Sequence, residues 1–287
     1  MNYKTIAHRT SQVASRISHI ALLLLTATAA QAECLLFDMS AREPVFRSNE
    51  KVTYTLSYTI MGAWINVGEV DFLTTLKDKE KRPFYHIEVN GKTYPFFDKF
   101  CPVRDYFATK IDAETLQPFY MQRNIDEDGY RRNSTGHYNW RDTVIYTTTQ
   151  RIDKPQPVKL DTLRLTPCTF DVVSLFYYYR CCDFSKMREK TTYIVQLAMD
   201  NEVYNISYKL LGREEVKVKG VGKFRTLKFS GTLIAGSVFT GKEQVFFWVT
   251  DDDNRVPVYV EAPIKIGSIR VRIQSWENLK YAMKSKM

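Results

Sequence analysis

The stretch Thr166-Pro-Cys-Thr-Phe-Asp-Val-Val-Ser-Leu-Phe-Tyr-Tyr-Tyr-Arg-Cys-Cys182 decides how the chain is interpreted. Apolar residues recur in it at the i, i+3, i+4, i+7 spacing of an α-helix, at Val172, Leu175, Phe176 and Tyr179. Pro167 suits a first helical turn, and Thr166 or Thr169 could cap the helix. The pattern predicts a short buried helix near residues 168–181. A buried strand is the alternative, because valine and tyrosine also favour sheets.

Short segments of alternating polar and apolar residues flank this stretch on both sides. The first of them places five apolar side chains on one face, namely Val52, Tyr54, Leu56, Tyr58 and Ile60. Gly68 stands where the alternation changes parity, which indicates a β-bulge, and Asp128-Gly129 indicates a hairpin. Roughly a dozen strands without a β-α-β rhythm predict a mainly β fold. We expect antiparallel sheet, open or closed like a barrel, with one short central helix.

The first 32 residues have the features of an export signal that is cleaved after Ala32. A basic start is followed by an apolar core at residues 20–25 and by a small-x-small motif at residues 30–32. We therefore expect an exported protein of the periplasm or cell envelope. A lipid anchor on Cys34 is disfavoured, because Glu33 precedes it where a lipoprotein signal carries a small residue.

The remaining residues, 33–287, are expected to form a single β-rich domain, either as one body or as two halves, 49–165 and 190–280, joined by the helix. The formal net charge of the whole chain is +9, but basic residues are mixed with acidic ones, as at residues 77–82 and 213–219. Without a basic stripe, the chain is not expected to bind nucleic acid. Peripheral association with an anionic membrane stays open.

All five cysteines follow the export signal, and export permits disulfides. Along an intact helix, Cys168 and Cys181 would lie roughly 20 Å apart, beyond the ~7 Å that a disulfide spans. We expect buried single thiols. The alternative is a bridge from Cys101 to one of the three cysteines Cys168, Cys181 and Cys182.

Several short pieces, taken in order, carry a resemblance to a known family. The clearest are NEKVTYTLSY at residues 49–58 and WVTDDDNRVPV at residues 248–258; the others are residues 62, 67–70, 104–106, 111–118, 171–180 and 212–216. In this order they resemble the exported bacterial proteins known as domain of unknown function 3108. The resemblance implies an exported β-rich envelope protein, and it implies neither an activity nor catalytic residues.

Residues typical of catalytic sites are sparse. Beyond the export signal there are two histidines, His86 and His137, without the spacing of a zinc site, and no nucleophile elbow or phosphate-binding glycine loop. We therefore expect no cofactor. Asp251 and Asp253 are a weak alternative for a metal site, but a tight turn between two strands accounts for the Asp-Asp-Asp-Asn sequence equally simply.

Six residues are candidates for ligand binding, because they are aromatic or lie in the pieces that resemble the family: Trp64, Arg104, Asp105, Tyr106, Tyr178 and Trp248. We expect a non-enzymatic scaffold whose sheet, curved around the helix, binds an apolar or amphipathic small molecule such as a lipid or a glycan. One alternative is a structural component of an envelope complex. The other is an enzyme acting on cell-wall glycan through carboxylates such as Asp105 or Asp251 to Asp253.

Overall fold

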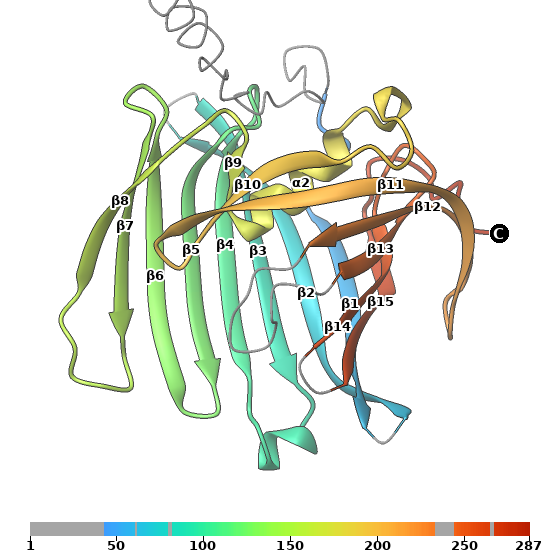
Figure 1. Ribbon diagram of the computed structural model, residues 1–287, viewed down its shortest axis with the longest axis horizontal. Coiled ribbons are helices and arrows are strands. Elements are labelled where there is room, and N and C mark those ends of the chain that lie inside the picture. The colour runs from blue at the N-terminus through green and yellow to red at the C-terminus, as the bar shows by residue number, and fades with distance from the viewer. Residues whose placement is uncertain (1–42, 61, 80–81, 233–243, 265–266) are drawn as a thin grey trace, which may run out of the picture. The chain divides into compact units, whose positions relative to one another are not determined.

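Figure 1 shows the computed structural model, which describes residues 43–60, 62–79, 82–232, 244–264 and 267–287. The predicted export signal and Cys34 lie outside these residues. Among the described residues, no helix has the length and apolar composition that crossing a membrane requires.

The described residues form fifteen strands, one α-helix and two short 3-10 turns. The strands before the helix are β1 (Glu50–Ile60), β2 (Ala63–Lys79), β3 (Arg82–Thr93), β4 (Arg104–Asp112), β5 (Pro118–Glu127), β6 (Tyr130–Asn139), β7 (Val144–Arg151), β8 (Lys159–Arg164) and β9 (Thr169–Phe170). The helix is α2 (Val172–Cys181), and the 3-10 turns are η2 (Phe97–Lys99) and η3 (Phe184–Lys186). The strands after the helix are β10 (Tyr193–Met199), β11 (Glu202–Val218), β12 (Gly222–Thr232), β13 (Gln244–Thr250), β14 (Pro257–Pro263) and β15 (Ser268–Glu277).

All of these strands belong to one sheet, in the order β8-β7-β6-β5-β4-β3-β2-β1-β15-β14-β13-β12-β11-β10-β9 (Figure 1). The pairings are antiparallel except that of β9 with β10. Pairing of β1 with β15 joins the strands that precede α2 to those that follow it. Because β8 and β9 are edge strands in the described sheet, the sheet is open. The predicted fold class, mainly antiparallel β with one short central helix, is confirmed.

The helix begins at a different residue from the one predicted. Asp171 is its N-cap: the carboxylate accepts hydrogen bonds from the amides of Val173 and Ser174, both at 3.0 Å, and the Ser174 hydroxyl accepts one from the Asp171 amide. Pro167 therefore precedes the helix, and Thr169 lies in β9, where its hydroxyl donates to Gln196 at 2.9 Å. The prediction of a start near residue 168, with Thr166 or Thr169 as the cap, is wrong because pairing with β10 keeps Thr169 and Phe170 extended.

The helix packs against strands that precede it in the sequence and against strands that follow it. Val173 and Tyr177 pack with Tyr85, Ile87, Val89 and Ile111 of β3 and β4. Phe176 stacks on Phe72 of β2, with ring centroids 4.6 Å apart. On another side, Tyr179 makes an edge contact with Tyr208 of β11, at 4.8 Å. The predicted buried helix is confirmed, and the alternative of a buried strand is wrong.

Near its C-terminal end, the helix buries a charged pair. Arg180 is 1% exposed and donates to both carboxylate oxygens of Glu50, which is 0% exposed, at 2.5 and 3.2 Å. Its Nε donates to the Asn254 carbonyl at 3.1 Å. Burial alone would lower the pKa of Arg180, but the Glu50 carboxylate raises it. The pair connects α2 to β1 and to the loop between β13 and β14.

Two predictions about turns and strand irregularities are confirmed. Leu56 pairs with Gly68 and Ser57 with Asn66, so Val67 is the extra residue of a β-bulge. Gly68 is required there, because a Cβ atom on it would lie 2.4 Å from the Lys92 carbonyl oxygen. Asp128 and Gly129 have φ of 48° and 83° and form the β5–β6 hairpin turn.

The cysteine predictions have a mixed outcome. Cys168 is disulfide-bonded, whereas Cys101, Cys181 and Cys182 are thiols. Cys181 and Cys182 are buried, as expected for single thiols. The alternative of a bridge from Cys101 is wrong, because Cys101 is an exposed thiol in the loop after η2.

Candidate functional site

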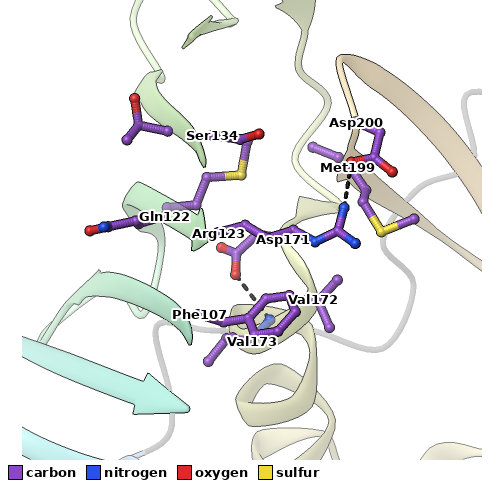
Figure 2. A pocket seen from close by; sticks show the side chains of 12 residues that line it. Phe107, Gln122, Arg123, Ser134, Asp171, Val172, Val173, Met199 and Asp200 are labelled. Carbon is purple, nitrogen blue, oxygen red and sulfur yellow. Dashed lines mark hydrogen bonds and ion pairs between the residues drawn. The ribbon is translucent and has the colours of Figure 1, made fainter. Parts of the chain in front are cut away.

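A small hollow lies at the N-terminal end of α2, between the helix, the strands β4–β6 and the end of β10 (Figure 2). Its walls include the apolar side chains of Phe107, Met121, Val173 and Ala198. The hollow has a volume of about 40 Å³, which is room for only about three water molecules. A second hollow beside the helix, at Tyr177 and Tyr178, measures about 10 Å³. Neither hollow can hold a lipid or a sugar ring, because aromatic side chains fill the space around α2.

Asp171 is an ionisable group in the wall of the larger of these two hollows, and its oxygens already have donors. Besides the helix amides, Ser174 donates to it at 2.6 Å, Thr109 at 2.9 Å and Tyr138 at 3.3 Å. Burial raises the pKa of Asp171, and the hydrogen bond from the Ser174 side chain opposes that rise. With so many donors supplied by the chain itself, Asp171 positions the helix and has little capacity left for a ligand.

The opposite wall of this hollow carries a small ion cluster. Asp200, at the β10–β11 turn, accepts hydrogen bonds from Arg123 of β5 and Arg132 of β6. Figure 2 shows the Arg123 guanidinium pointing to Asp200. These contacts bring the β10–β11 hairpin back to strands that lie far from it in the sheet order.

Four of the six predicted ligand-binding residues have structural partners. Tyr178 is 6% exposed, and its ring lies 4.3 Å from that of Phe170. Arg104 pairs with Asp98 at 2.6 Å, and Tyr106 donates to Glu88 at 2.8 Å. Asp105 accepts a hydrogen bond from the Asp126 amide at 3.1 Å. Arg104 and Asp105 therefore do not form the ion pair with each other that adjacent opposite charges suggest.

Asp105 is nevertheless an unusual carboxyl group. Burial raises its pKa to about 6, and the neighbouring Glu127 contributes to the rise, while the hydrogen bond from Asp126 opposes it. Asp105 lies at the end of β4, where its pairing with β5 stops, and it does not line the hollow that contains Trp64.

The other two predicted residues, Trp64 and Trp248, belong to one continuous row of aromatic and cationic side chains. The Arg270 guanidinium lies over the Trp64 ring, 3.6 Å from its centroid, and 5.3 Å from that of Tyr259. Tyr259 makes an edge contact with Trp248 at 5.0 Å. The ammonium of Lys228 lies 4.9 Å from the centre of the Trp248 ring.

The strand register explains how these distant residues meet. Trp248 of β13 lies opposite Tyr259 of β14, and Tyr259 lies opposite Arg272 of β15. Directly paired residues project from the same face of a sheet, so the row crosses the strands at right angles. Trp64 on β2 joins it across β1, because Thr59 pairs with Trp64 and Ser57 with Arg270.

One end of this row opens into a groove, here called the Trp64 groove, of about 790 Å³. The groove lies between these strands and the end of the β11–β12 hairpin; its lining is Thr55, Trp64, Ile65, Asn66, Lys217, Lys219, Gly220, Val221, Tyr259, Arg270, Arg272, Ile273 and Gln274. Four of these side chains are cationic, and none of the lining residues is acidic. Trp248 itself lies behind Tyr259 and is 8% exposed. Typical small-molecule sites measure roughly 300–1,000 Å³.

The cations of the Trp64 groove differ in their partners. Arg270 is paired with Glu261 at 3.1 Å. Arg272 donates to the neutral oxygens of Asn66, at 2.8 Å, and Ser57, at 3.4 Å. Its Nε is buried without a hydrogen-bond partner among the described residues. Burial and the hydrogen bond to Glu261 together raise the pKa of Tyr259 to about 12.

Sequence reasoning found Trp64 but missed the residues that surround it. Arg270 and Arg272 alternate with apolar residues along one strand, and that pattern is a visible signal that both face away from the core. Nothing in the sequence indicates that they meet Trp64, more than 200 residues earlier, or the lysines of the β11–β12 hairpin.

The weak alternative of a metal site at Asp251 and Asp253 gains no support. Asp251 accepts from Arg213 at 2.9 Å, and Asp253 lies 3.9 Å from Lys284. Asp252 caps the turn by accepting from Thr250 and from the Asn254 amide. In the part of the chain that the structure describes, no three potential ligand side chains of His, Cys, Asp or Glu gather at one point.

Comparison with known proteins bears on the fold and the family. The chain is similar to a crystal structure of a beta-barrel-like protein of domain of unknown function DUF1849 from Brucella abortus, with a TM-score of 0.51 and 10% identity over 81% of this chain and 99% of that one. At that identity the likeness concerns the fold alone. No curated protein matches the sequence. The model of the family described as "Protein of unknown function (DUF3108)" matches residues 53–274, and the chain therefore belongs to that family.

Proposed function

We propose that this protein is an exported, non-enzymatic β scaffold that binds an amphipathic ligand, a lipid or a glycan, in the Trp64 groove. The observation that carries the proposal is the contrast in volume: about 790 Å³ beside Trp64 against about 40 Å³ beside α2. The ligand therefore binds on the side of the sheet that carries the row, rather than around the helix.

The groove has the surface that such a ligand needs. The rings of Trp64 and Tyr259 both contact Arg270, which holds them in place, and all three residues line the groove. Aromatic faces bind sugar rings or acyl chains, and the flanking polar groups orient the ligand. Ile65, which is 36% exposed, adds apolar area at the end of β2.

Titration with amphiphiles tests the proposal. Protein purified from cell envelopes is examined by native mass spectrometry for co-purified lipid or glycan, and then titrated with dodecyl maltoside while tryptophan fluorescence is followed. Trp64→Ala is expected to abolish co-purification and to weaken the titration. Tyr146→Ala, which removes a 50% exposed aromatic from β7, is the matched control and is expected to bind normally. Equal binding by both variants contradicts the proposal.

Export is tested separately. N-terminal sequencing of the protein from the periplasmic fraction is expected to begin at Glu33, the residue after the small-x-small motif. Recovery of chains that start at Met1 from the cytoplasm contradicts that part of the proposal.

One observation favours the alternative of a structural component in an envelope complex. Phe96 and Phe100 are 63% and 68% exposed beside η2, and the turn that carries them is held by Asp98, which pairs with Arg104. Rigid exposed aromatics are typical of contact surfaces. Crosslinking in intact cells through a photoreactive residue at position 96 tests this candidate, and a monomer without adducts contradicts it.

The carboxylate enzyme has no comparable support. Asp105 lies at the β4–β5 edge near Glu127, whereas Asp251 lines a different hollow, beside η3. Asp105 therefore does not share a cleft with Asp251, as glycoside hydrolysis by that pair requires. Asp251, Asp252 and Asp253 do line one hollow, but Asp251 accepts a hydrogen bond from Arg213, and Asp252 accepts from Thr250 and from the Asn254 amide.

A further inference from the structure

We propose that the Trp64 groove contains a subsite for a phosphate-type oxyanion, formed by Arg272, Lys217 and Lys219. The inference rests on the proposed function, because it names the charged part of the ligand that the groove binds. The apolar part then lies against Trp64 and Tyr259, and the phosphate lies at the end of the groove formed by the β11–β12 hairpin.

The first argument is an uncompensated positive charge. No acidic side chain lines the groove, and Glu261 neutralises only Arg270. Among the described residues, no ion pair is formed by Lys217, Lys219 or Arg272. Like charges that share a groove repel one another, so the folded protein lowers its energy when an anion binds there.

The second argument is that the acidic residues nearest in sequence to Lys217 and Lys219 form ion pairs with other lysines. Glu214 and Glu215 belong to the same hairpin as Lys217 and Lys219, but they pair with Lys228, at 2.9 Å, and with Lys223. Glu214 and Glu215 are therefore paired with other lysines of the hairpin, and Lys217 and Lys219 line the groove without an acidic partner among the described residues.

The third argument is the geometry of Arg272. Among the described residues, its hydrogen-bond partners are neutral oxygens on Asn66 and Ser57, which fix the guanidinium without cancelling its charge. Its Nε is buried and has no partner among the described residues, so a bound anion would meet the terminal nitrogens of the guanidinium. A guanidinium held in this way matches two phosphate oxygens, and lysine ammonium groups add point charges.

Phosphate fits this set better than a carboxylate does. The charge of about −1.5 to −2 that a phosphate monoester carries at neutral pH offsets more of the three positive charges than the single charge of a carboxylate does. A phosphorylated lipid headgroup, a phosphorylated glycan and free phosphate share this chemistry, and the experiment distinguishes among them.

The test is a calorimetric titration of the exported full-length protein with three probes: dodecyl phosphate, dodecyl maltoside below its micelle concentration, and inorganic phosphate. We expect dodecyl phosphate to bind about tenfold more tightly than the maltoside at low salt, since charge-assisted hydrogen bonds add to the apolar contact. Arg272→Gln, and separately Lys217→Gln with Lys219→Gln, are expected to remove that advantage and to leave maltoside binding within twofold of wild type. Lys77→Gln with Lys154→Gln, which changes the net charge equally at distant exposed positions, is the control and keeps the advantage.

The outcomes separate the subsite from the proposed function. If both amphiphiles bind equally and the lysine variant changes nothing, the subsite is refuted while ligand binding in the groove stands. If inorganic phosphate binds and neither amphiphile does, the subsite stands and the proposed function is refuted. Competition by inorganic phosphate against dodecyl phosphate, but not against the maltoside, supports both. Loss of binding in the distant lysine control points to net charge alone and overturns the subsite.

Discussion

Two arginines, Arg180 in the interior and Arg272 in the Trp64 groove, differ in whether a carboxylate balances their positive charge. Arg180 is 1% exposed and has a carboxylate, Glu50, and a backbone carbonyl as partners. Arg272 has only neutral side-chain oxygens as partners, and one of its donors is unused. The interior therefore pairs the charge of Arg180 with a buried carboxylate, whereas the groove leaves positive charge without a counter-ion among the described residues. This difference separates residues that hold the fold from residues that are available to a ligand.

The largest expected effect is in the interior. Glu50→Gln removes the partner of Arg180 and leaves a buried cation uncompensated, which is expected to lower the free energy of unfolding by about 3–5 kcal/mol. The quantity is measured by urea unfolding followed by circular dichroism. A loss near zero would place Arg180 in contact with water and would remove the basis of the comparison.

A double variant sharpens that result. Glu50→Leu with Arg180→Met replaces both charges with apolar side chains of similar size, and the loss is expected to be clearly smaller than for Glu50→Gln alone, because no orphan charge remains. A double variant as unstable as the single one would mean that packing, not charge pairing, sets the cost at this position.

The next largest loss of stability is expected at the N-terminal end of α2. Asp171→Ala removes the N-cap and takes a carboxylate acceptor from the buried hydroxyls of Thr109, Tyr138 and Ser174, so we expect a loss of about 2–3 kcal/mol in the free energy of unfolding. Asp171→Asn keeps an oxygen for the helix amides and is expected to lose less. If the two variants lose the same amount, the charge of Asp171 matters more than its role as a cap.

This end of the helix also shows the limit of prediction from sequence. The i, i+3, i+4, i+7 spacing is local information, and it correctly predicts a buried helix. Where the helix begins depends on Thr169, whose hydroxyl binds Gln196, and on pairing between β9 and β10. Those partners lie 27 residues further along the chain, and no local capping signal can reveal them.

The groove was even less accessible to prediction than the helix start. Trp64 is recognisable as a candidate because tryptophan is rare and suited to binding, but its neighbours come from β11, β14 and β15. Alternation predicts which face of a strand a residue occupies, not which strand lies beside it. Arg104, Asp105 and Tyr106 were chosen by family resemblance, which cannot distinguish a residue that holds a loop from one that binds a ligand.

Asp105 gives a smaller and pH-dependent effect. Its pKa in the folded state is about 6, above the ordinary value of 3.8, so the folded protein disfavours the ionised carboxylate. The resulting cost to stability is absent well below pH 3.8, grows between pH 3.8 and about pH 6, and is fully present above pH 6. Asp105→Asn keeps an acceptor for the Asp126 amide and removes this cost, so it is expected to stabilise the protein at pH 7.5 by about 1 kcal/mol, a value reduced for partial solvent exposure.

Urea unfolding of Asp105→Asn and wild type at pH 4 and pH 7.5 checks this expectation. The two proteins are expected to have nearly equal stability at pH 4 and to differ at pH 7.5. A stabilisation of the same size at both values, or a loss at pH 7.5, would show that burial does not penalise the ionised form of Asp105.

The smallest expected change in the free energy of unfolding has the opposite sign to that of Glu50→Gln. Lys217→Gln with Lys219→Gln removes two cations from the Trp64 groove, and because they have no acidic partner among the described residues, unfolding is expected to become harder by at most about 0.5 kcal/mol. Removing a charge from Glu50 therefore destabilises the protein, whereas removing charges from the groove does not.

With dodecyl phosphate present, the order of stability of wild type and the lysine variant reverses, since a ligand that binds only the folded state stabilises wild type more than the variant. Thermal unfolding of both proteins with and without dodecyl phosphate measures this reversal. A variant that is less stable than wild type without ligand would show that the lysines serve the fold, and that the groove resembles the interior after all.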